Sequence, residues 1–344
     1  MAHDSSRHIR MKTKRKKSKR RRLINIFLMS LFIIIGTTIT YGYNTWNNAA
    51  NVVTDSFESD GRDQGSALRD PEFELDEENI SILFIGVDQG GNREINDRGL
   101  SDALILATLN KSDKSVKMVN IPRDSYVYIP YRDEYTKITH AHAYGGTRAA
   151  IETVEYLFDV PVDYYMTINF NAFIDVVDTL GGIEVDVPFE MHELDSKDRK
   201  EAIHLLPGEQ RLNGEEALAF VRSRKYDNDF ERGNRQQEAL QAMFNEALSF
   251  NNVLNVNKLI NAVGSNMKTN IPFNQIVALS TNFISPSLSI ETIPLQGNDL
   301  ITDLYYFDLD KEHLEEVKTD LRIHLDIEES NLDSFNSDQE SFQD

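Results

Sequence analysis

The stretch DALILATLNKSDKSVKMVNI, residues Asp102–Ile121, places two apolar runs on either side of the turn sequence NKSDK. Both runs, Asp102–Leu109 and Ser115–Ile121, have the length of a strand, and together they predict a hairpin. A third run, ISILFIGV at Ile80–Val87, is continuously apolar, as expected of a strand buried on both faces. These strands predict a sheet with both faces covered.

Strand and helix patterns alternate along the rest of the chain. The segment TRAAIETVEYLF, residues 147–158, predicts a helix, because its apolar residues recur at helical spacing. The following segments predict, in order, a strand at VDYYMTINF, a helix at NAFIDVVDTL that ends at Gly181 and Gly182, and a strand at IEVDVP. A longer helix is expected from about Glu231 to Phe250. This order predicts the α/β class, as a three-layer α-β-α domain with a mixed central sheet.

The N-terminus has the charge pattern of a membrane anchor. Eleven of the 36 Lys and Arg residues lie within residues 1–22, and residues 23–42 carry no charge. At a rise of about 1.5 Å per residue, such a helix matches one bilayer core. Basic residues resist translocation, so we expect one transmembrane signal anchor with a cytoplasmic N-terminus and an extracellular domain. A cleaved signal peptide is the alternative, but this apolar run exceeds the roughly 7 to 15 residues of a signal core.

The remaining chain divides into three parts by composition. Residues 43–78 are polar and predict an extracytoplasmic linker, residues 79–325 carry the folded domain, and residues 326–344 form an acidic tail that we expect to be disordered. Without residues 1–22 the net charge is near −30, which disfavours binding of nucleic acid by the outer domain. The chain has no cysteine, which excludes disulfides, a thiol nucleophile and cysteine-ligated zinc. A cell surface without oxidative folding, as in Gram-positive bacteria, fits this composition.

Two aspartates adjoin the predicted strands. Asp88 directly follows the run Ile80–Val87, and Asp102 begins the next run. If these strands are neighbours, both carboxylates lie at one end of the sheet. Such a pair suits Mg²⁺, which binds one or two carboxylates and completes its shell with water and phosphate oxygens. The alternative is that both are ordinary turn and strand-end residues, positions that Asp favours.

Arginines gather in two places that can reach the same sheet end. Arg123 follows the third strand, and the segment AFVRSRKYDNDFERGNRQQEAL, residues 219–240, contains Arg222 and Arg224 two positions apart. Further on, three donors lie near one face of the predicted helix at its start: Arg232, Arg235 and Gln236. Planar guanidinium groups beside a helix N-terminus predict a phosphate site. The alternative is a solvated, salt-bridged face with Asp229 as an N-cap.

Other polar residues give weaker signals. The segment KITHAHAYGG contains His140 and His142, but without a third ligand nearby in sequence they favour packing or hydrogen bonding over zinc. Lys137 in the same segment can serve as a point charge for phosphate or as an ordinary surface lysine. No serine lies in a G-x-S-x-G or S-x-x-K setting, so nucleophilic acyl transfer has no support.

On these residues the sequence resembles the LytR-CpsA-Psr family, especially the teichoic-acid ligases of Gram-positive bacteria. The resemblance covers the whole exported domain and rests on the order and spacing of five blocks: ILFIGVD, SDALILATLNKSDKSVKMVNIPRDSYVYIP, KITHAHAYGG, VDYYMTINFNAFIDVVDTLGGIEVDVP and LNGEEALAFVRSRKYDNDFERGNRQQ. It implies a membrane-anchored phosphotransferase that moves an anionic glycopolymer from a polyprenyl diphosphate carrier to the C6 hydroxyl of N-acetylmuramic acid in peptidoglycan. It also implies Mg²⁺ and an arginine-lined diphosphate site over a hydrophobic lipid pocket.

The resemblance assigns expected roles by position. It implies that Asp88 and Asp102 hold Mg²⁺, and that three arginines bind the diphosphate: Arg123, Arg222 and Arg224. The residues expected to assist are Lys137, Arg232, Arg235 and Gln236. The chain departs from the family pattern at Leu100, where the family usually has Arg, and Arg98 is the candidate that replaces it in substrate binding.

Three other functions remain open at this point. A polyprenyl diphosphate hydrolase would use the same site with water as the attacking group. A non-catalytic regulator or binding protein of the cell envelope would need the arginines but not both carboxylates. Binding of DNA by residues 1–22 would be salt-dependent and would show no sequence preference.

Overall fold

The computed structural model describes residues 44–62, 65–69, 79–87, 99–223, 229–248, 266–283 and 288–327. The chain divides into two compact units, Met1–Asn51 and Val52–Asp344, and the second contains the sheet. The basic tail 1–22, the predicted membrane span 23–42 and residues 328–344 of the acidic tail lie outside the described residues. Within the described ranges, no helix has both the length and the apolar character needed to cross a membrane.

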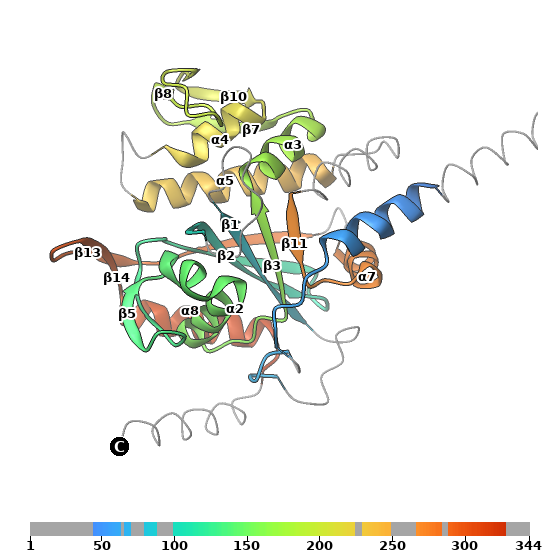
Figure 1. The fold of residues 1–344 in the computed structure, drawn as a ribbon, viewed down its shortest axis with the longest axis vertical. Coiled ribbons are helices and arrows are strands. Elements are labelled where there is room, and N and C mark those ends of the chain that lie inside the picture. Colours follow the sequence, from blue (N-terminus) through green and yellow to red (C-terminus); the bar gives the residue numbers. More distant parts are fainter. Residues whose placement is uncertain are drawn as a thin grey trace, which may run out of the picture. The chain divides into compact units, whose positions relative to one another are not determined.

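A six-stranded mixed sheet forms the centre of the second unit (Figure 1). Its strand order is β11 (Met267–Thr269), β6 (Tyr164–Asn169), β1 (Ile80–Val87), β2 (Ser101–Asn110), β3 (Ser115–Ile121) and β12 (Ser289–Pro294). Strands β1 and β6 pair parallel, as do β3 and β12, whereas β2 is antiparallel to both its neighbours. The predicted hairpin and the mixed sheet are confirmed. Strands β1 and β2 are neighbours, and Val87 pairs with Ser101 at one end of the sheet.

Helices pack on both faces of this sheet. On one face, Leu83 and Ile85 of β1 share a core with residues of α2 (Thr139–Phe158) and α8 (Lys311–His324). On the other face, Ile82 and Met118 share a core with residues of α5 (Asp229–Leu248) and α7 (Phe273–Phe283). Because apolar side chains alternate to both faces, the strands read as continuous apolar runs.

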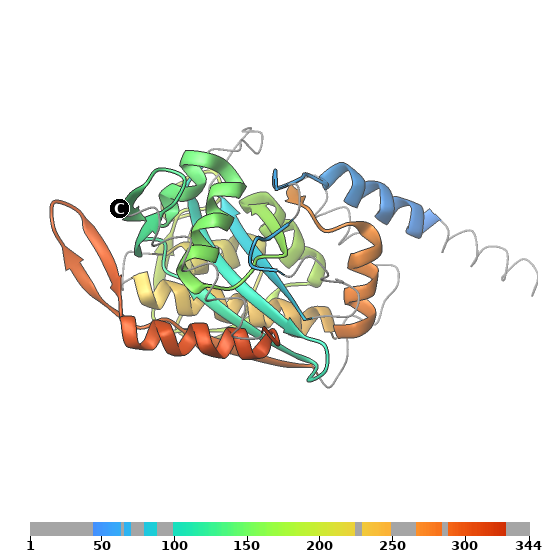
Figure 2. The same cartoon turned by 90° about the horizontal axis from the view of Figure 1, so that it is seen from below.

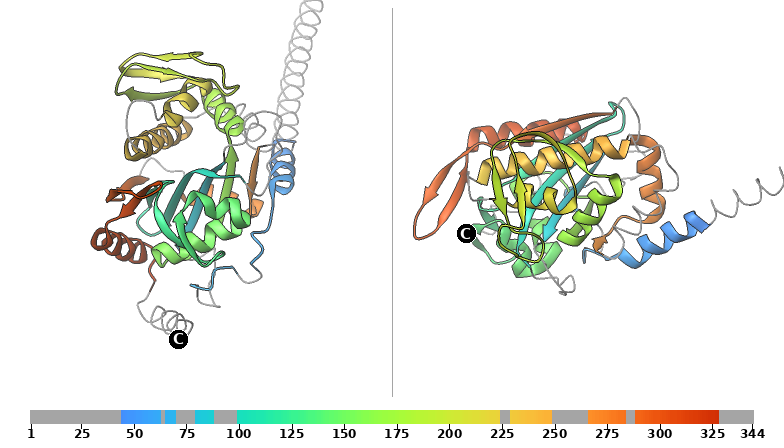
Figure 3. Two further views of the ribbon diagram at one scale, coloured as in Figure 1. Left: turned by 60° about the vertical axis from the view of Figure 1, so that its left-hand side comes forward. Right: turned by 90° about the horizontal axis from the view of Figure 1, so that it is seen from above.

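A smaller group of elements lies beyond one end of the sheet (Figure 3, left). It consists of α3 (Phe170–Leu180), β7 (Ile183–Val187), β8 (Met191–Glu193), β9 (Ile203–Leu205), β10 (Gly208–Leu212) and α4 (Gly214–Arg222). These elements and α5 enclose a separate core that includes Phe220. As the glycine signal predicts, α3 ends at Gly181, which has a left-handed φ of 88°. Asn213 and Glu216 form a capping box that starts α4.

Two hairpins complete the domain. One joins β4 (Tyr126–Ile129) to β5 (Glu134–Lys137), and the other joins β13 (Gly297–Ile301) to β14 (Tyr305–Leu309). The second hairpin extends away from the body of the domain (Figure 2). Helix α2 begins at Thr139, earlier than the sequence predicts, with non-helical backbone at Gly145 and Gly146. Helix α5 is described over Asp229–Leu248, which covers the expected helix from its start at about Glu231 to the last described residue.

The segment expected as a linker, residues 43–78, has more structure than its polar composition predicts. Residues 44–56 are helical. Arg62 donates to Glu155 at 2.8 Å and to the carbonyl of Val162 at 2.7 Å. Arg69 forms an ion pair with Asp163 at 2.6 Å. Ion pairs and hydrogen bonds of Arg62 and Arg69, whose partners lie far away in the sequence and could not be predicted from it, therefore hold this part of the segment on the domain.

His324 is a buried polar group at the end of α8. Its Nδ1 lies 2.7 Å from Thr108 Oγ1, and its Nε2 lies 2.8 Å from Ser115 Oγ. Burial lowers the pKa of His324, and the positive charge of Lys117 lowers it further. The imidazole therefore lies between two hydroxyl groups in surroundings that disfavour its protonated form.

Candidate functional site

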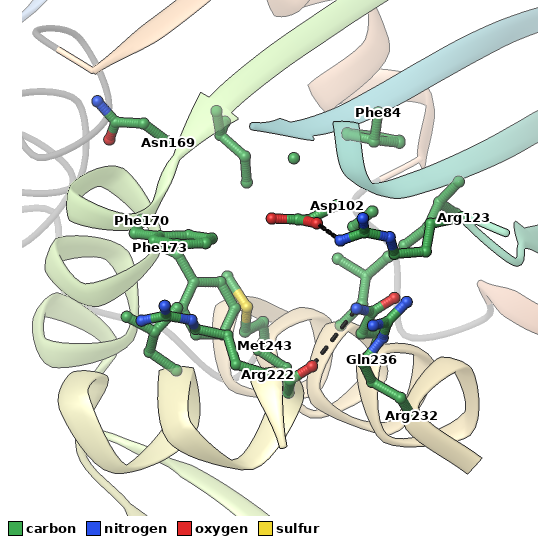
Figure 4. A pocket seen from close by; sticks show the side chains of 17 residues that line it. Phe84, Asp102, Arg123, Asn169, Phe170, Phe173, Arg222, Arg232, Gln236 and Met243 are labelled. Atoms are coloured by element: carbon green, nitrogen blue, oxygen red, sulfur yellow. Dashed lines mark hydrogen bonds and ion pairs between the residues drawn. The ribbon is translucent and has the colours of Figure 1, made fainter. Parts of the chain in front are cut away.

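A cavity of about 340 Å³ lies between one end of the sheet and the helices α3, α4 and α5 (Figure 4). Its wall combines two kinds of side chain. The charged and amide side chains are Asp102, Arg123, Asn169, Arg222, Arg232 and Gln236. The apolar ones are Phe84, Ala103, Ile105, Ile168, Phe170, Phe173, Leu218, Val221, Leu240 and Met243.

The β2–β3 hairpin brings Asp102 and Arg123 together. Leu104 pairs with Ile121, so continuing this register by two residues places Asp102 opposite Arg123. The Arg123 guanidinium forms an ion pair with the Asp102 carboxylate (Figure 4). Both side chains are mostly buried, so this pair is shielded from bulk water.

Arg222 is the last residue of α4 and approaches the cavity from the side opposite Arg123 (Figure 4). Its guanidinium carbon lies 4.5 Å from the centroid of the Phe170 ring, a cation–π arrangement. Its ion pair is long, at 3.7 Å from Asp198, whose side chain is 76% exposed. Arg222 is thus oriented by an aromatic ring while its charge is only weakly compensated.

Helix α5 contributes Arg232 and Gln236, which lie one turn apart on the same face and line the cavity. Gln236 Nε2 donates to the carbonyl of Val221 at 3.4 Å. Arg235, predicted to assist in substrate binding, is instead buried between α5 and α4 and is not among the residues that line the cavity. It donates to the carbonyls of Phe220 at 2.9 Å and Ser223 at 2.6 Å.

The different placement of Arg235 and Gln236 has a simple geometric reason. Successive helical residues are about 100° apart, so Arg235 and its neighbour Gln236 point in different directions. Arg232 and Gln236, by contrast, differ by only about 40°. Arg235 therefore uses its donors to satisfy carbonyls at the end of α4, which have no partner within that helix.

Lys137 is not among the residues that line the cavity. Its Nζ is 2.8 Å from an oxygen of Asp124, and the same oxygen is 3.8 Å from Arg123 Nε. Lys137 thus adds positive charge near Arg123 and shares a carboxylate with it. Burial lowers the pKa of the nearby His140 imidazole, and Lys137 and Arg123 lower it further.

The two histidines that precede Gly145, His140 and His142, make hydrogen bonds with other groups of the protein. His140 Nδ1 lies 3.0 Å from Thr136 Oγ1. His142 is buried, and its Nδ1 lies 2.7 Å from the carbonyl of Gly99. Thr139 donates to the carbonyl of Ser101 at 2.7 Å. The start of α2 therefore fixes the backbone that leads into Asp102.

The structure brings three of the five predicted catalytic residues to one cavity: Asp102, Arg123 and Arg222. Asp88, Arg98 and Arg224 lie outside the described residues. Of the other four candidates, Arg232 and Gln236 line the cavity, whereas Lys137 and Arg235 do not.

Sequence reasoning identified the charged wall but not the apolar one. Leu240 and Met243 belong to the apolar face predicted for α5, yet nothing in that pattern separates a cavity wall from ordinary core. Phe170 and Phe173 come from the start of α3, and Phe84 comes from β1. Only the packing of β1, α3 and α5 against one another reveals that these apolar side chains face one space.

This arrangement suits an amphiphilic anion. Guanidinium groups from two sides can bind phosphate oxygens with paired hydrogen bonds. The adjacent apolar wall can cover hydrocarbon. The Asp102 carboxylate points into the cavity and offers the hard oxygen ligand that Mg²⁺ prefers (Figure 4).

Comparison with known proteins gives a consistent result. The model of the LytR_cpsA_psr family matches residues 40–323. The polyisoprenyl-teichoic acid–peptidoglycan teichoic acid transferase TagT of Bacillus subtilis is 38% identical over 321 residues, which cover 92% of this chain and 98% of TagT.

Solved structures of TagT are also similar to this chain. One, described as TagT bound to LI-WTA, has a TM-score of 0.66 and 38% identity, and the match covers 78% of this chain and 98% of that one. Another, described as having a bound octaprenyl pyrophosphate lipid, has a TM-score of 0.63 and 37% identity over the same shares.

Proposed function

The chain belongs to the LytR-CpsA-Psr family, and from this premise we propose that it transfers an anionic glycopolymer, such as a teichoic acid, from a polyprenyl diphosphate carrier to peptidoglycan. The observation that carries the proposal is the cavity in which Asp102, Arg123 and Arg222 adjoin an apolar wall. The name of TagT as a teichoic acid transferase and its structure with a polyprenyl pyrophosphate lipid support this reading.

The proposed acceptor is the C6 hydroxyl of N-acetylmuramic acid. Its oxygen attacks the phosphorus that carries the glycopolymer, the bond from that phosphorus to the bridging oxygen breaks, and polyprenyl phosphate leaves. The hydroxyl proton passes to solvent or to a base. Phosphoryl transfer depends mainly on positioning and on neutralising charge at the leaving oxygen, so it needs no protein nucleophile. Arg123 and Arg222 supply that charge from opposite sides of the cavity.

The proposed cofactor is Mg²⁺, held by Asp102 and by Asp88. The chemistry of the described donor fits, because Asp102 is a carboxylate beside the arginines that would bind the diphosphate. When bound, the ion neutralises charge on diphosphate oxygens. Arg123 then orients the Asp102 carboxylate toward the cavity through their ion pair.

A single assay separates this function from its rivals. The purified chain is incubated with carrier-linked polymer, with and without peptidoglycan. We expect covalent attachment of polymer only when peptidoglycan is present. Release of free polymer at the same rate in both mixtures would indicate a hydrolase instead. Binding without either product would leave a regulatory or binding role.

We also propose that the chain is a single-pass protein of the cell membrane with its catalytic domain outside. The motivation is the uncharged segment 23–42 behind eleven basic residues. Protease added to intact protoplasts should remove the C-terminal end and spare the N-terminus. Protection of the C-terminal end would contradict this topology.

A further inference from the structure

A cluster of nitrogen and oxygen donors lies on the β8–β9 strand pair, apart from the cavity. His192 and His204 are directly opposite each other across the two strands. Their neighbours Met191 and Leu205 are buried in the core, so alternation along each strand turns both histidines outward. Glu190, two residues before His192, joins them on the outer side.

The three side chains converge on a small volume. The imidazole rings stack with centroids 4.2 Å apart and planes only 13° apart. Glu190 Oε1 lies 2.8 Å from His204 Nε2 and 3.4 Å from His192 Nε2. One ligand atom from each residue lies within 4.8 Å of the others.

We propose that Glu190, His192 and His204 bind a transition-metal ion of borderline softness, such as Zn²⁺. With metal–nitrogen bonds of about 2.0–2.1 Å, tetrahedral ligand atoms are roughly 3.3 Å apart. The two separations measured from Glu190 Oε1 lie on either side of that value. The exposed imidazole rings, which are nearly parallel, tilt toward each other when both ligate one ion. Two imidazoles select such an ion over Mg²⁺, which prefers oxygen ligands. The fourth position is left to water.

The alternative is a set of exposed hydrogen bonds between histidine and glutamate that binds no ion. A hydrogen-bonded cluster explains the contact at 2.8 Å from His204. Cross-strand pairing accounts for the stacking of the two rings, and a bound ion would give both Nε2 atoms and the carboxylate oxygen beside them a common partner.

The position of the cluster gives it a structural consequence. The same strand pair ends at Glu193, which accepts a hydrogen bond from Ser223 Oγ at 2.7 Å. The connection between β8 and β9 contains Asp198, the ion-pair partner of Arg222. An ion that joins the two strands would therefore restrain a connection that contacts Arg222 of the cavity wall.

The test is calorimetric titration of the full chain in detergent with ZnCl₂, in excess Mg²⁺ and with a purification tag that lacks histidine. We expect one site whose affinity falls by about tenfold or more in H192A and in H204A. H313Q is the matched control, because it removes a partly buried histidine on α8 that lies outside the cluster, and it should bind as the wild type does. Unchanged affinity in the H192A/H204A double variant would overturn the proposal.

A second measurement keeps the proposal testable if a variant fails to fold. Amide hydrogen exchange of the wild-type chain is followed with and without Zn²⁺. We expect slower exchange in Met191–Glu193 and Ile203–Leu205. Slower exchange that is confined to other segments would place the ion elsewhere and refute the assignment.

Discussion

Replacing Arg222 by Ala should separate activity from stability. In the absence of substrate, this side chain makes a cation–π contact with Phe170 and a long ion pair with the exposed Asp198. Exposed ion pairs contribute about 0–1 kcal/mol and exposed cation–π contacts about 0.5–1 kcal/mol. The variant should therefore lose about 1 to 2 kcal/mol of folding stability at most, and less if these terms overlap.

Loss of activity should be much larger. In the proposed transition state, Arg222 balances charge on a diphosphate oxygen inside a partly water-excluded cavity. Removing such a donor costs about 2 to 4 kcal/mol, or roughly 30- to 1000-fold in rate. Arg222→Lys should restore only part of this, because one ammonium cannot replace a planar pair of donors.

The assay is ligation of polymer to peptidoglycan by purified full chains, with urea unfolding measured in parallel. Arg148→Ala is the matched control, since Arg148 is exposed, pairs with Glu152 on α2 and does not line the cavity. It should keep both activity and stability. A combined Arg222→Ala and Arg224→Ala variant excludes compensation between neighbours. If that double variant is folded and fully active, the arginines do not bind the diphosphate.

Three further predictions concern Arg235, Asp102 and His324. Arg235→Ala should lose about 2 to 4 kcal/mol of stability in urea unfolding, because the carbonyls of Phe220 and Ser223 lose a buried charged donor; wild-type stability would show that these bonds contribute little. Asp102→Ala should weaken the binding of Mg²⁺, so that a higher Mg²⁺ concentration restores part of the ligation rate. A loss of rate that no Mg²⁺ concentration relieves would argue against metal binding by Asp102. Because the pKa of His324 is lowered in the folded chain, the unfolded chain binds more protons, and the free energy of unfolding should fall as the pH drops below about 6.5. His324→Asn should reduce the slope of the free energy of unfolding against pH. An equal slope in both proteins would assign the pH dependence to other groups.

The sheet could be predicted from the sequence because its strands are buried on both faces. The predicted strands Ile80–Val87 and Ser115–Ile121 begin and end at the same residues in the structure. The meeting of Asp102 and Arg123 also follows from sequence, since a hairpin with a short turn fixes its own register.

What the sequence could not reveal depends on tertiary packing. Helix propensity places Arg235 and Gln236 side by side, but only the approach of α4 decides which of them meets carbonyls and which meets the cavity. The early start of α2 was hidden by histidines and glycines, which are poor helix formers. The strands β8 and β9 have only three residues each, too few for a period to be recognised.

The most direct measurement is a crystal structure of the chain with a polyprenyl diphosphate bound. The account predicts that the diphosphate lies between Arg123 and Arg222, with Asp102 facing it through Mg²⁺, and that the hydrocarbon follows the wall formed by Phe170 and Met243. A diphosphate bound outside this cavity, with Arg123 and Arg222 both turned away from it, would contradict the account.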